Sequence, residues 1–160
     1  MQIVLRLAQE FERSFCESLS RKNMESYRAA RKIAWDQARF NASWSQFENM
    51  VLASGSELLG VVRVCPEGEA LGLRDLQVLP EWQRQGVGAF ALEKIRQLAI
   101  SRGYDRLQLR VFAENPAKSL YERSGFRTVS DVDGTLHMIQ ELLPNNSFKP
   151  SPLRGLGRAP

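Results

Sequence analysis

The side chains in the second half of the chain follow two different periods, which predicts strands alternating with helices. Residues 71–79 divide into two alternating faces, as in a strand, and Pro80 ends the run. The apolar residues that then recur at helical spacing are Val87, Ala91, Ile95 and Leu98. They predict a helix that Gly103 stops.

Two further pairs of elements are expected after this helix. Residues 107–112 form an apolar, β-branched run that predicts a strand. Residues 116–124 predict a short helix that has Asn115 as its cap and proline at its first position. Residues 126–132 and 135–143 then predict a closing hairpin. The second half therefore has the order strand, helix, strand, helix, strand, strand.

The beginning of the chain is less regular. Residues 3–8 predict a first strand, and residues 9–35 predict one or two helices broken near residues 20–23. Trp35 and Trp44 are expected to bracket a loop. The predicted order of this part is strand, helix, loop.

Two apolar runs connect this part to the second half. Residues 50–53 and 58–65 are rich in β-branched side chains and are joined by a short polar segment with glycine, so they predict a hairpin. Residues 66–69 predict the next turn. These strands add to those of the second half.

The bulk composition gives the expected domain organisation. At 160 residues, with 43% hydrophobic and 25% charged residues, the chain has a normal globular composition and the length of one ordinary domain. We expect a single domain over residues 1–143 and a flexible, basic tail over residues 144–160, which is rich in proline and has no acidic residue.

The net charge of +4 would suggest nucleic acid if it lay on the folded domain. Three of these charges lie in the tail, on Lys149, Arg154 and Arg158, so the predicted domain is nearly neutral. We therefore expect no nucleic acid partner.

The cysteines and the hydropathy pattern suggest a location. Cys16 and Cys65 are isolated, with no metal-ligand or redox spacing, which is typical of a reducing compartment. No run approaches the ~18 apolar residues of a membrane span. The expectation is a cytoplasmic protein that does not bind membranes.

A glycine-rich turn, Gln83-Arg84-Gln85-Gly86-Val87-Gly88, stands between the predicted strand and the predicted helix. Its glycines let the backbone approach a ligand closely, and the first helical amides direct positive partial charge at that ligand. A pyrophosphate fits such a site, and Arg84 adds a full charge. The turn is not a dinucleotide fingerprint, because no acidic strand end follows about twenty residues later. It also lacks the Gly-Lys-Ser/Thr ending of a P-loop.

A second motif follows at residues 115–126, with Asn-Pro-Ala, Leu-Tyr-Glu and Gly-Phe in that order. Together with Leu76-Gln77-Val78, Pro80-Glu81 and the glycine turn, it closely resembles the GNAT superfamily of N-acetyltransferases. The paired match spans residues 71–126. The resemblance implies an α/β (α+β) fold with a mixed, mostly antiparallel central sheet of about six to seven strands, flanked by helices on both faces.

The resemblance implies acetyl-CoA as co-substrate and no metal. Backbone groups of residues 76–78 would bind the pantetheine arm like an added strand, and the amides of residues 84–89 would hold the pyrophosphate. Asn115 would reach the pantetheine region or serve as a helix cap. The coenzyme residues implied are Leu76, Gln77, Val78, Gln83, Arg84, Gln85, Gly86, Val87, Gly88, Ala89, Asn115 and Tyr121.

The implied reaction is acyl transfer from a thioester to an amine. The backbone N–H of Val78 resembles the family's oxyanion donor. Tyr121 resembles its general acid, which protonates the departing thiolate. The alternative role for Tyr121 is an aromatic anchor for its short helix.

A general base is missing from the places where the family carries one, which correspond here to Gly72, Arg74 and Arg110. Asp75 is the nearest carboxylate in sequence, but by alternation it points away from Arg74, so a structural carboxylate is favoured over a base. His137 is the only histidine and is a lesser candidate. A water chain or an amine that arrives neutral are the alternatives.

The sequence says least about the amine that accepts the acetyl group. Trp35 and Glu48 belong to an aromatic and acidic cluster that could line an amine pocket, although ordinary helix packing is the favoured explanation of this cluster. Arg74 and Arg110 would instead favour a substrate that bears a carboxylate.

The function expected from these residues is acetylation of a small-molecule or peptide amine. The resemblance also allows a homodimer. Two alternatives stay open, namely a non-catalytic acyl-CoA-binding regulatory module, which the missing base favours, and an enzyme that acetylates a tRNA-linked amine, which would need a basic surface on the domain.

Overall fold

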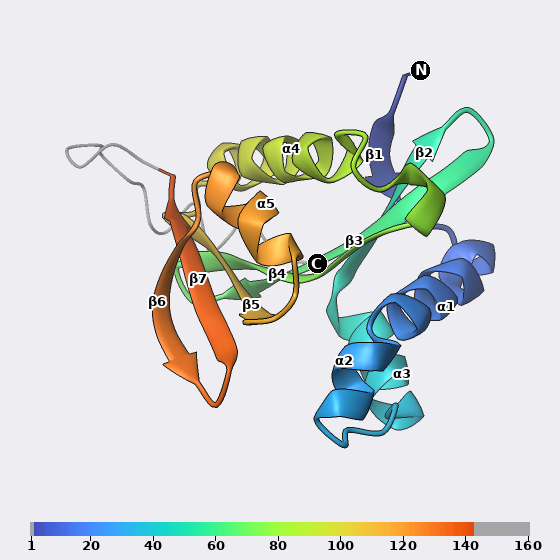
Figure 1. The fold of residues 1–160 in the computed structure, drawn as a ribbon. Helices are drawn as coiled ribbons and strands as arrows, with labels where there is room; N and C mark the ends of the chain where they lie inside the picture. The colour runs from blue at the N-terminus through green and yellow to red at the C-terminus, as the bar shows by residue number, and fades with distance from the viewer. Residues whose placement is uncertain (1, 143–160) are drawn as a thin grey trace. The chain divides into compact units, whose positions relative to one another are not determined.

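The computed structural model of the protein describes residues 2–142, so the predicted tail lies outside the described residues. Seven strands form one sheet in the order β1-β2-β3-β4-β5-β7-β6, flanked by helices (Figure 1). The strands are β1 Val4–Leu7, β2 Glu48–Ser54, β3 Glu57–Glu67, β4 Ala70–Val78, β5 Arg106–Phe112, β6 Arg127–Val132 and β7 Thr135–Glu141. The helices are α1 Arg13–Asn23, α2 Glu25–Ala30, α3 Gln37–Gln46, α4 Val87–Ser101 and α5 Ala117–Arg123, with 3-10 turns η1 Glu10–Glu12 and η2 Pro80–Trp82. The mixed sheet confirms the predicted fold class.

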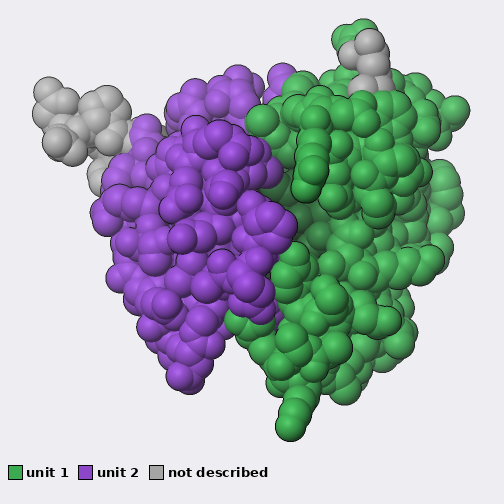
Figure 2. Space-filling model, in the orientation of Figure 1, with its two compact units in different colours: residues 1–65, 74–91 green, residues 66–73, 92–160 purple. Residues whose placement is uncertain are grey.

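The described chain divides into two compact units (Figure 2). The first comprises residues 1–65 and 74–91, and the second comprises residues 66–73 and 92–160. The expectation of a single domain over residues 1–143 stays a prediction. No helix in the described part of the chain is long and apolar enough to cross a membrane.

In the first unit, β2 pairs antiparallel with β1 and with β3, as the predicted hairpin requires. A hydrophobic cluster packs the apolar side of α1 against these strands. Its buried members are Cys16, Leu19, Val51 and Val61, and its partly buried members are Ala8, Phe15, Trp44, Leu58 and Leu79. Removing these side chains from water is the main stabilising contribution of the unit.

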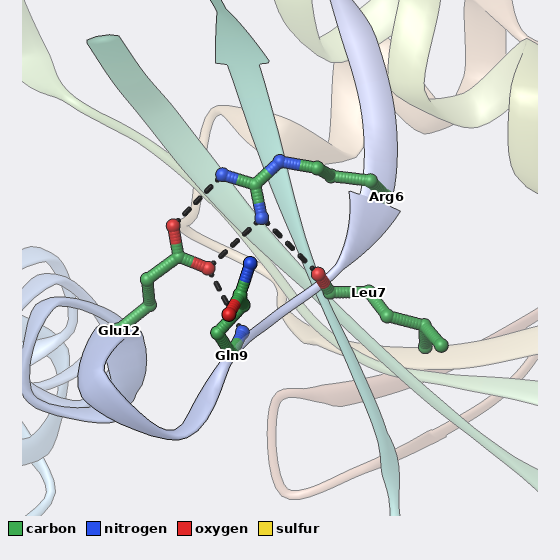
Figure 3. A network of polar contacts seen from close by, with 4 residues as sticks. All are labelled: Arg6, Leu7, Gln9 and Glu12. Carbon is green, nitrogen blue, oxygen red and sulfur yellow. Dashed lines mark hydrogen bonds and ion pairs between the residues drawn. The ribbon is translucent and has the colours of Figure 1, made fainter. Parts of the chain in front are cut away.

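A polar network fixes the junction between β1 and η1 (Figure 3). The guanidinium of Arg6 donates to both carboxylate oxygens of Glu12, at 2.9 and 2.8 Å, and to the carbonyl of Leu7 at 3.2 Å. The backbone N–H of Gln9 donates to Glu12 Oε1 at 2.9 Å, which completes one half of a capping box. Glu12 is only 4% exposed, so this pairing satisfies a buried charge.

In the second unit, β4 pairs parallel with β5 from Ala70↔Arg106 to Leu73↔Leu109, and β7 pairs antiparallel with β5 and with β6. The hairpin of β6 and β7 is drawn in orange and red in Figure 1. Alternate residues of β5 are buried, namely Leu107, Leu109 and Val111. The intervening residues of β5 therefore share the opposite face of the sheet.

Two predictions about local structure were wrong. Residues 37–46 form α3 rather than a loop, because the Asp36 side chain accepts the backbone N–H of Arg39 at 2.9 Å and starts a helix there. Pro66 and Glu67 belong to β3, and the turn is confined to residues 68 and 69, where Gly68 has φ of 63°. The remaining predicted strands and helices are present. Their ends are shifted by one or two residues, except that the helices predicted for residues 9–35 end at Ala30, five residues before the predicted end.

Candidate active site

The connection from β4 to α4 has a left-handed backbone at two residues. Arg84 has φ of 63° and Gly86 has φ of 85°. Residues 83–86 are exposed, and a Cβ on Gly86 would meet no atom within 4 Å. Phe90 N–H donates to the Gly86 carbonyl at 3.0 Å, so the amides of residues 87–89 precede the first helical hydrogen bond. Such amides, next to an open and exposed backbone, can bind an anion.

Two glutamines of the predicted motif hold this turn in shape. Gln83 Nε2 donates to the Val78 carbonyl at 3.0 Å, and Gln85 Nε2 donates to the Glu81 carbonyl at 2.8 Å. These bonds tie the turn to the end of β4 and to η2. A turn fixed in this way needs little reorganisation when a ligand binds.

A polar network in the first unit joins α1 to the last residues of β4. Ser20 Oγ donates to Asp75 Oδ2, and Gln77 Nε2 donates to Asp75 Oδ1 at 2.9 Å. Asn23 Nδ2 donates to Gln77 Oε1 at 3.2 Å and to the Val78 carbonyl at 3.0 Å. The network fixes the side chains of the β4 segment that was predicted to contact the coenzyme.

Burial raises the pKa of Asp75, while the hydrogen bonds from Ser20 and Gln77 and the charge of Arg63 act in the opposite direction. Both carboxylate oxygens of Asp75 accept hydrogen bonds within this unit. This is the arrangement expected of a structural carboxylate, which was the favoured interpretation of Asp75.

In the second unit, Asn115 caps α5. Its Oδ1 accepts the backbone N–H of Ala117 at 2.9 Å. The cap uses the amide oxygen, and the amide nitrogen is a separate donor, so capping does not exclude ligand binding.

Tyr121 lies on the same helix and is 7% exposed. Its ring meets the ring of Phe126 edge-on, with centroids 5.8 Å apart. The ring therefore anchors α5. A tyrosine can do this and still present its hydroxyl to a ligand, because the ring and the hydroxyl are separate parts of the side chain.

Two positively charged arginine side chains lie over the ring of Trp35. The guanidinium groups of Arg21 and Arg28 lie 5.5 and 5.2 Å from its centroid, and Phe40 packs beside it at 5.6 Å. A cationic amine would meet like charge there, so this geometry favours an anion over the amine considered in the sequence analysis. Glu48 begins β2 and is partly buried.

Arg63 is a prominent residue that the sequence analysis missed. It is 5% exposed, and its side chain donates to Asn49 Oδ1 at 2.8 Å and to Ser43 Oγ at 2.5 Å. Its guanidinium lies 5.0 Å from the Phe47 centroid, and the exposed Arg74 lies 4.9 Å from the same ring. Burial lowers the pKa of Arg63. The signal that could have identified it is a lone arginine inside an apolar strand.

Arg110 and His137 meet Glu67 and Gln108 in the second unit. Arg110 is 3.9 Å from Glu67 Oε1, and His137 Nε2 is 3.2 Å from Gln108 Oε1. Burial and the charge of Arg110 lower the pKa of His137. In the described residues, no group of three or more His, Cys, Asp or Glu side chains is placed to hold a metal ion.

The sequence of residues 6–126 matches the model of the Acetyltransferase (GNAT) family. This match covers most of the chain, and the seven-stranded mixed sheet agrees with it. The chain therefore belongs to the GNAT family of acetyltransferases, as the paired motifs predicted.

Individual relatives add detail. Thialysine N-epsilon-acetyltransferase of Bos taurus is 30% identical over 69 residues, which are 42% of this chain and 41% of that protein. The match thus spans about two fifths of the curated relative.

Solved structures show the same fold. PaiA N-acetyltransferase from Thermoplasma acidophilum, in complex with coenzyme A, superposes with a TM-score of 0.71 at 16% identity, covering 88% of this chain and 99% of that chain. The ribosomal-protein-S18-alanine N-acetyltransferase from Escherichia coli gives 0.70 at 20% identity, covering 92% and 99%. At these identities the likeness is one of fold.

Proposed function

We propose that this protein is an acetyl-CoA-dependent N-acetyltransferase that moves the acetyl group from the coenzyme thioester to a primary amine. The observation that carries the proposal is the turn between β4 and α4, where an exposed, left-handed Gly86 stands beside amides that precede the first helical hydrogen bond. Membership of the GNAT family supports the same coenzyme.

The proposed coenzyme contacts fall into two groups. The pyrophosphate contacts are Gln83, Arg84, Gln85, Gly86, Val87, Gly88 and Ala89, of which Gln83 and Gln85 also hold the turn. The pantetheine contacts are the backbone of Leu76, Gln77 and Val78 in the first unit and the side chains of Asn115 and Tyr121 in the second. Residues 76–78 follow the part of β4 that is in register with β5, and such a strand end can accept an added strand.

In the proposed reaction, the amine nitrogen attacks the thioester carbonyl, a carbon–nitrogen bond forms and the carbon–sulfur bond breaks. The Val78 N–H donates to the oxygen that becomes negative, and Tyr121 gives its proton to the coenzyme thiolate. The proton that the nitrogen loses as the amide forms passes to the Tyr121 phenolate, directly or through water. The carbonyl of Val78 accepts from Asn23 and Gln83, which supports a fixed orientation of this peptide unit.

The proposed acceptor is a primary amine on a small molecule or a peptide that also carries a carboxylate. The support comes from the exposed guanidinium groups of Arg74 and Arg110 and from the two arginines over Trp35. The bovine relative is named for thialysine and the Escherichia coli structure for an alanine of ribosomal protein S18, and these names supply probes.

The test is an acetylation assay in which thialysine, lysine and a peptide beginning with alanine are each incubated with protein and acetyl-CoA. Release of the coenzyme thiol and the mass of the acceptor are measured together. Transfer to any of these amines supports the proposal. Binding of acetyl-CoA without transfer to a broad set of amines would favour the non-catalytic module instead.

A further inference from the structure

Arg63 on β3 is a buried cation whose direct hydrogen-bond partners are neutral. Its Nε donates to Asn49 Oδ1 at 2.8 Å, and its Nη2 donates to Ser43 Oγ at 2.5 Å. Within residues 2–142 no carboxylate forms an ion pair with it. Asp75 acts on it from a distance, with both carboxylate oxygens already hydrogen-bonded to other side chains. A buried guanidinium without an ion pair is costly, so an anion beside it would be stabilising.

The third nitrogen of this guanidinium marks where such an anion could bind. Nη1 of Arg63 forms no hydrogen bond in the described part of the chain. It is also not one of the enclosed side-chain atoms that lack a partner there, so it reaches an accessible surface although the side chain as a whole is only 5% exposed. A guanidinium nitrogen donates and never accepts, so its ligand must offer an acceptor atom. A carboxylate oxygen offers one and also balances the charge.

Three aromatic rings hold the Arg63 guanidinium in place. Their centroids lie 4.6, 5.0 and 5.9 Å from its central carbon, for Phe40, Phe47 and Trp44 in that order. Contacts between a cation and ring faces are attractive, and together with the two hydrogen bonds they restrict the rotation of the side chain. Nη1 is therefore pre-organised, and little conformational entropy is lost when a ligand binds to it.

A second guanidinium lies by one of these rings. Arg74 is exposed, and its guanidinium carbon is 4.9 Å from the Phe47 centroid. Burial has the largest effect on the pKa of Arg63 and lowers it, Asp75 acts in the opposite direction, and the charges of Arg74 and Arg13 lower it further. Among the described residues, three guanidinium groups thus influence one another in this part of the first unit, next to the single carboxylate of Asp75. The excess of positive charge favours a bound anion.

We propose that Arg63 and Arg74 form the subsite that holds a carboxylate of the amine acceptor, with Arg63 as its fixed, buried member and Arg74 as its exposed one. This assignment rests on the proposed acetyl transfer. Residues 63 and 74 belong to the first unit, as do residues 76–78, which are the proposed pantetheine contacts. Arg74 precedes Leu76 by two residues on β4, which is about 7 Å along the strand. An acceptor anchored at Arg74 therefore lies beside the strand segment along which the thioester would be bound.

The test uses lysine, ε-aminocaproate and cadaverine, which share a terminal primary amine, while only the first two carry a carboxylate. The wild type should acetylate the two carboxylates with kcat/KM about tenfold or more above that for cadaverine. In Arg74→Gln this preference should shrink by about tenfold through a higher KM for the carboxylates, with kcat nearly unchanged. The kinetics with cadaverine and the Kd for acetyl-CoA should stay those of the wild type. Arg39→Gln is the matched control, because it removes an exposed guanidinium from α3 and should keep the preference.

Arg63→Met tests the buried member of the subsite. Methionine is flexible and apolar, and it can fill the space among the three rings, so circular dichroism should show a folded protein that has lost the preference for carboxylates. If Arg63→Met does not fold, Arg74→Gln alone decides between the outcomes. A wild type that acetylates cadaverine as well as lysine, or an Arg74→Gln protein with the preference of the wild type, would overturn the proposal. A wild type that binds no acetyl-CoA, or that acetylates no amine at all, would overturn the proposed function itself.

Discussion

The carbonyl oxygen of Gln77 occupies the place where a Cβ on Gly60 would lie. Because Gly60 has no side chain, β4 can approach β3 closely at the segment proposed to bind pantetheine. The Leu52 side chain, 3.1 Å from the same position, closes the other side. The position of the Gln77 and Val78 peptide units thus depends on a glycine on the neighbouring strand.

Gly60→Ala should therefore disturb both stability and coenzyme binding. The methyl group meets backbone that cannot move aside as a flexible side chain would, so we expect a loss of about 1–3 kcal/mol in the free energy of unfolding. The affinity for acetyl-CoA should fall as well. Urea denaturation and calorimetric titration measure the two effects, and a variant that matches the wild type in both would show that the close approach is unimportant.

Gly86→Trp should abolish acetyl-CoA binding, because the indole would fill the open space in which the pyrophosphate is proposed to lie. Gly55→Trp is the matched control, since Gly55 also has a positive φ, of 61°, and also has no atom within 4 Å of its Cβ position. Both variants carry similar backbone strain, of roughly 1–2 kcal/mol. Titration with acetyl-CoA should separate them, and equal affinities would place the coenzyme elsewhere.

Tyr121→Phe should slow acetyl transfer by about 10²-fold while leaving coenzyme affinity nearly intact. Phenylalanine keeps the edge-on contact with Phe126, so α5 should stay in place. Tyr104→Phe is the control, because it removes another buried phenol from the same unit. Steady-state kinetics measure kcat for both variants. A wild-type kcat for Tyr121→Phe would mean that the thiolate is protonated by another group.

Acid should weaken the protein through Glu12. The hydrogen bond from Arg6 lowers the pKa of Glu12 below its usual value of about 4.5. A lowered pKa in the folded state means that the stabilisation is complete above the unfolded pKa and is lost as the pH falls through the folded one. The advantage of the wild type over Glu12→Gln, expected to be about 1–3 kcal/mol at neutral pH, should therefore begin to shrink near the usual pKa of about 4.5 and disappear once the pH has fallen through the lowered pKa of the folded state.

Urea midpoints measured across this pH range test the expectation. Glu93→Gln serves as the comparison, because Glu93 pairs with Arg96 at 2.9 Å on an exposed surface. Such a pair contributes little to stability. A pH dependence of Glu12→Gln that parallels the wild type would show that the β1–η1 junction does not depend on this charge.

Local patterns in the sequence predicted most of the fold, but they failed where distant contacts decide the structure. α3 contains several polar residues of low helix propensity, and a loop was predicted there. The helix is stabilised by Arg63, whose guanidinium lies 4.6 Å from the Phe40 centroid and 5.9 Å from that of Trp44. Only the N-cap Asp36 and the i, i+4 spacing of the two aromatics pointed to a helix.

The candidate site also combines features that local sequence patterns predict with contacts that they do not. The glycine turn and the α5 motif are local and were predicted as such, because each needs particular residues at fixed spacing. Glu67 was assigned to a turn on account of Pro66, and its proximity to Gly72 follows from the way the strands lie together rather than from any periodicity. Alternation indicates which residues of β4 and β5 share a face, but not which carboxylate of another strand joins them.

The most direct test of the proposed coenzyme site is calorimetric titration of the purified protein with acetyl-CoA. We predict saturable binding at a single site, with affinity that survives Gly55→Trp and is lost in Gly86→Trp. A wild-type protein that is folded by circular dichroism, yet binds neither acetyl-CoA nor CoA, would contradict the proposed function and leave the GNAT fold without its coenzyme.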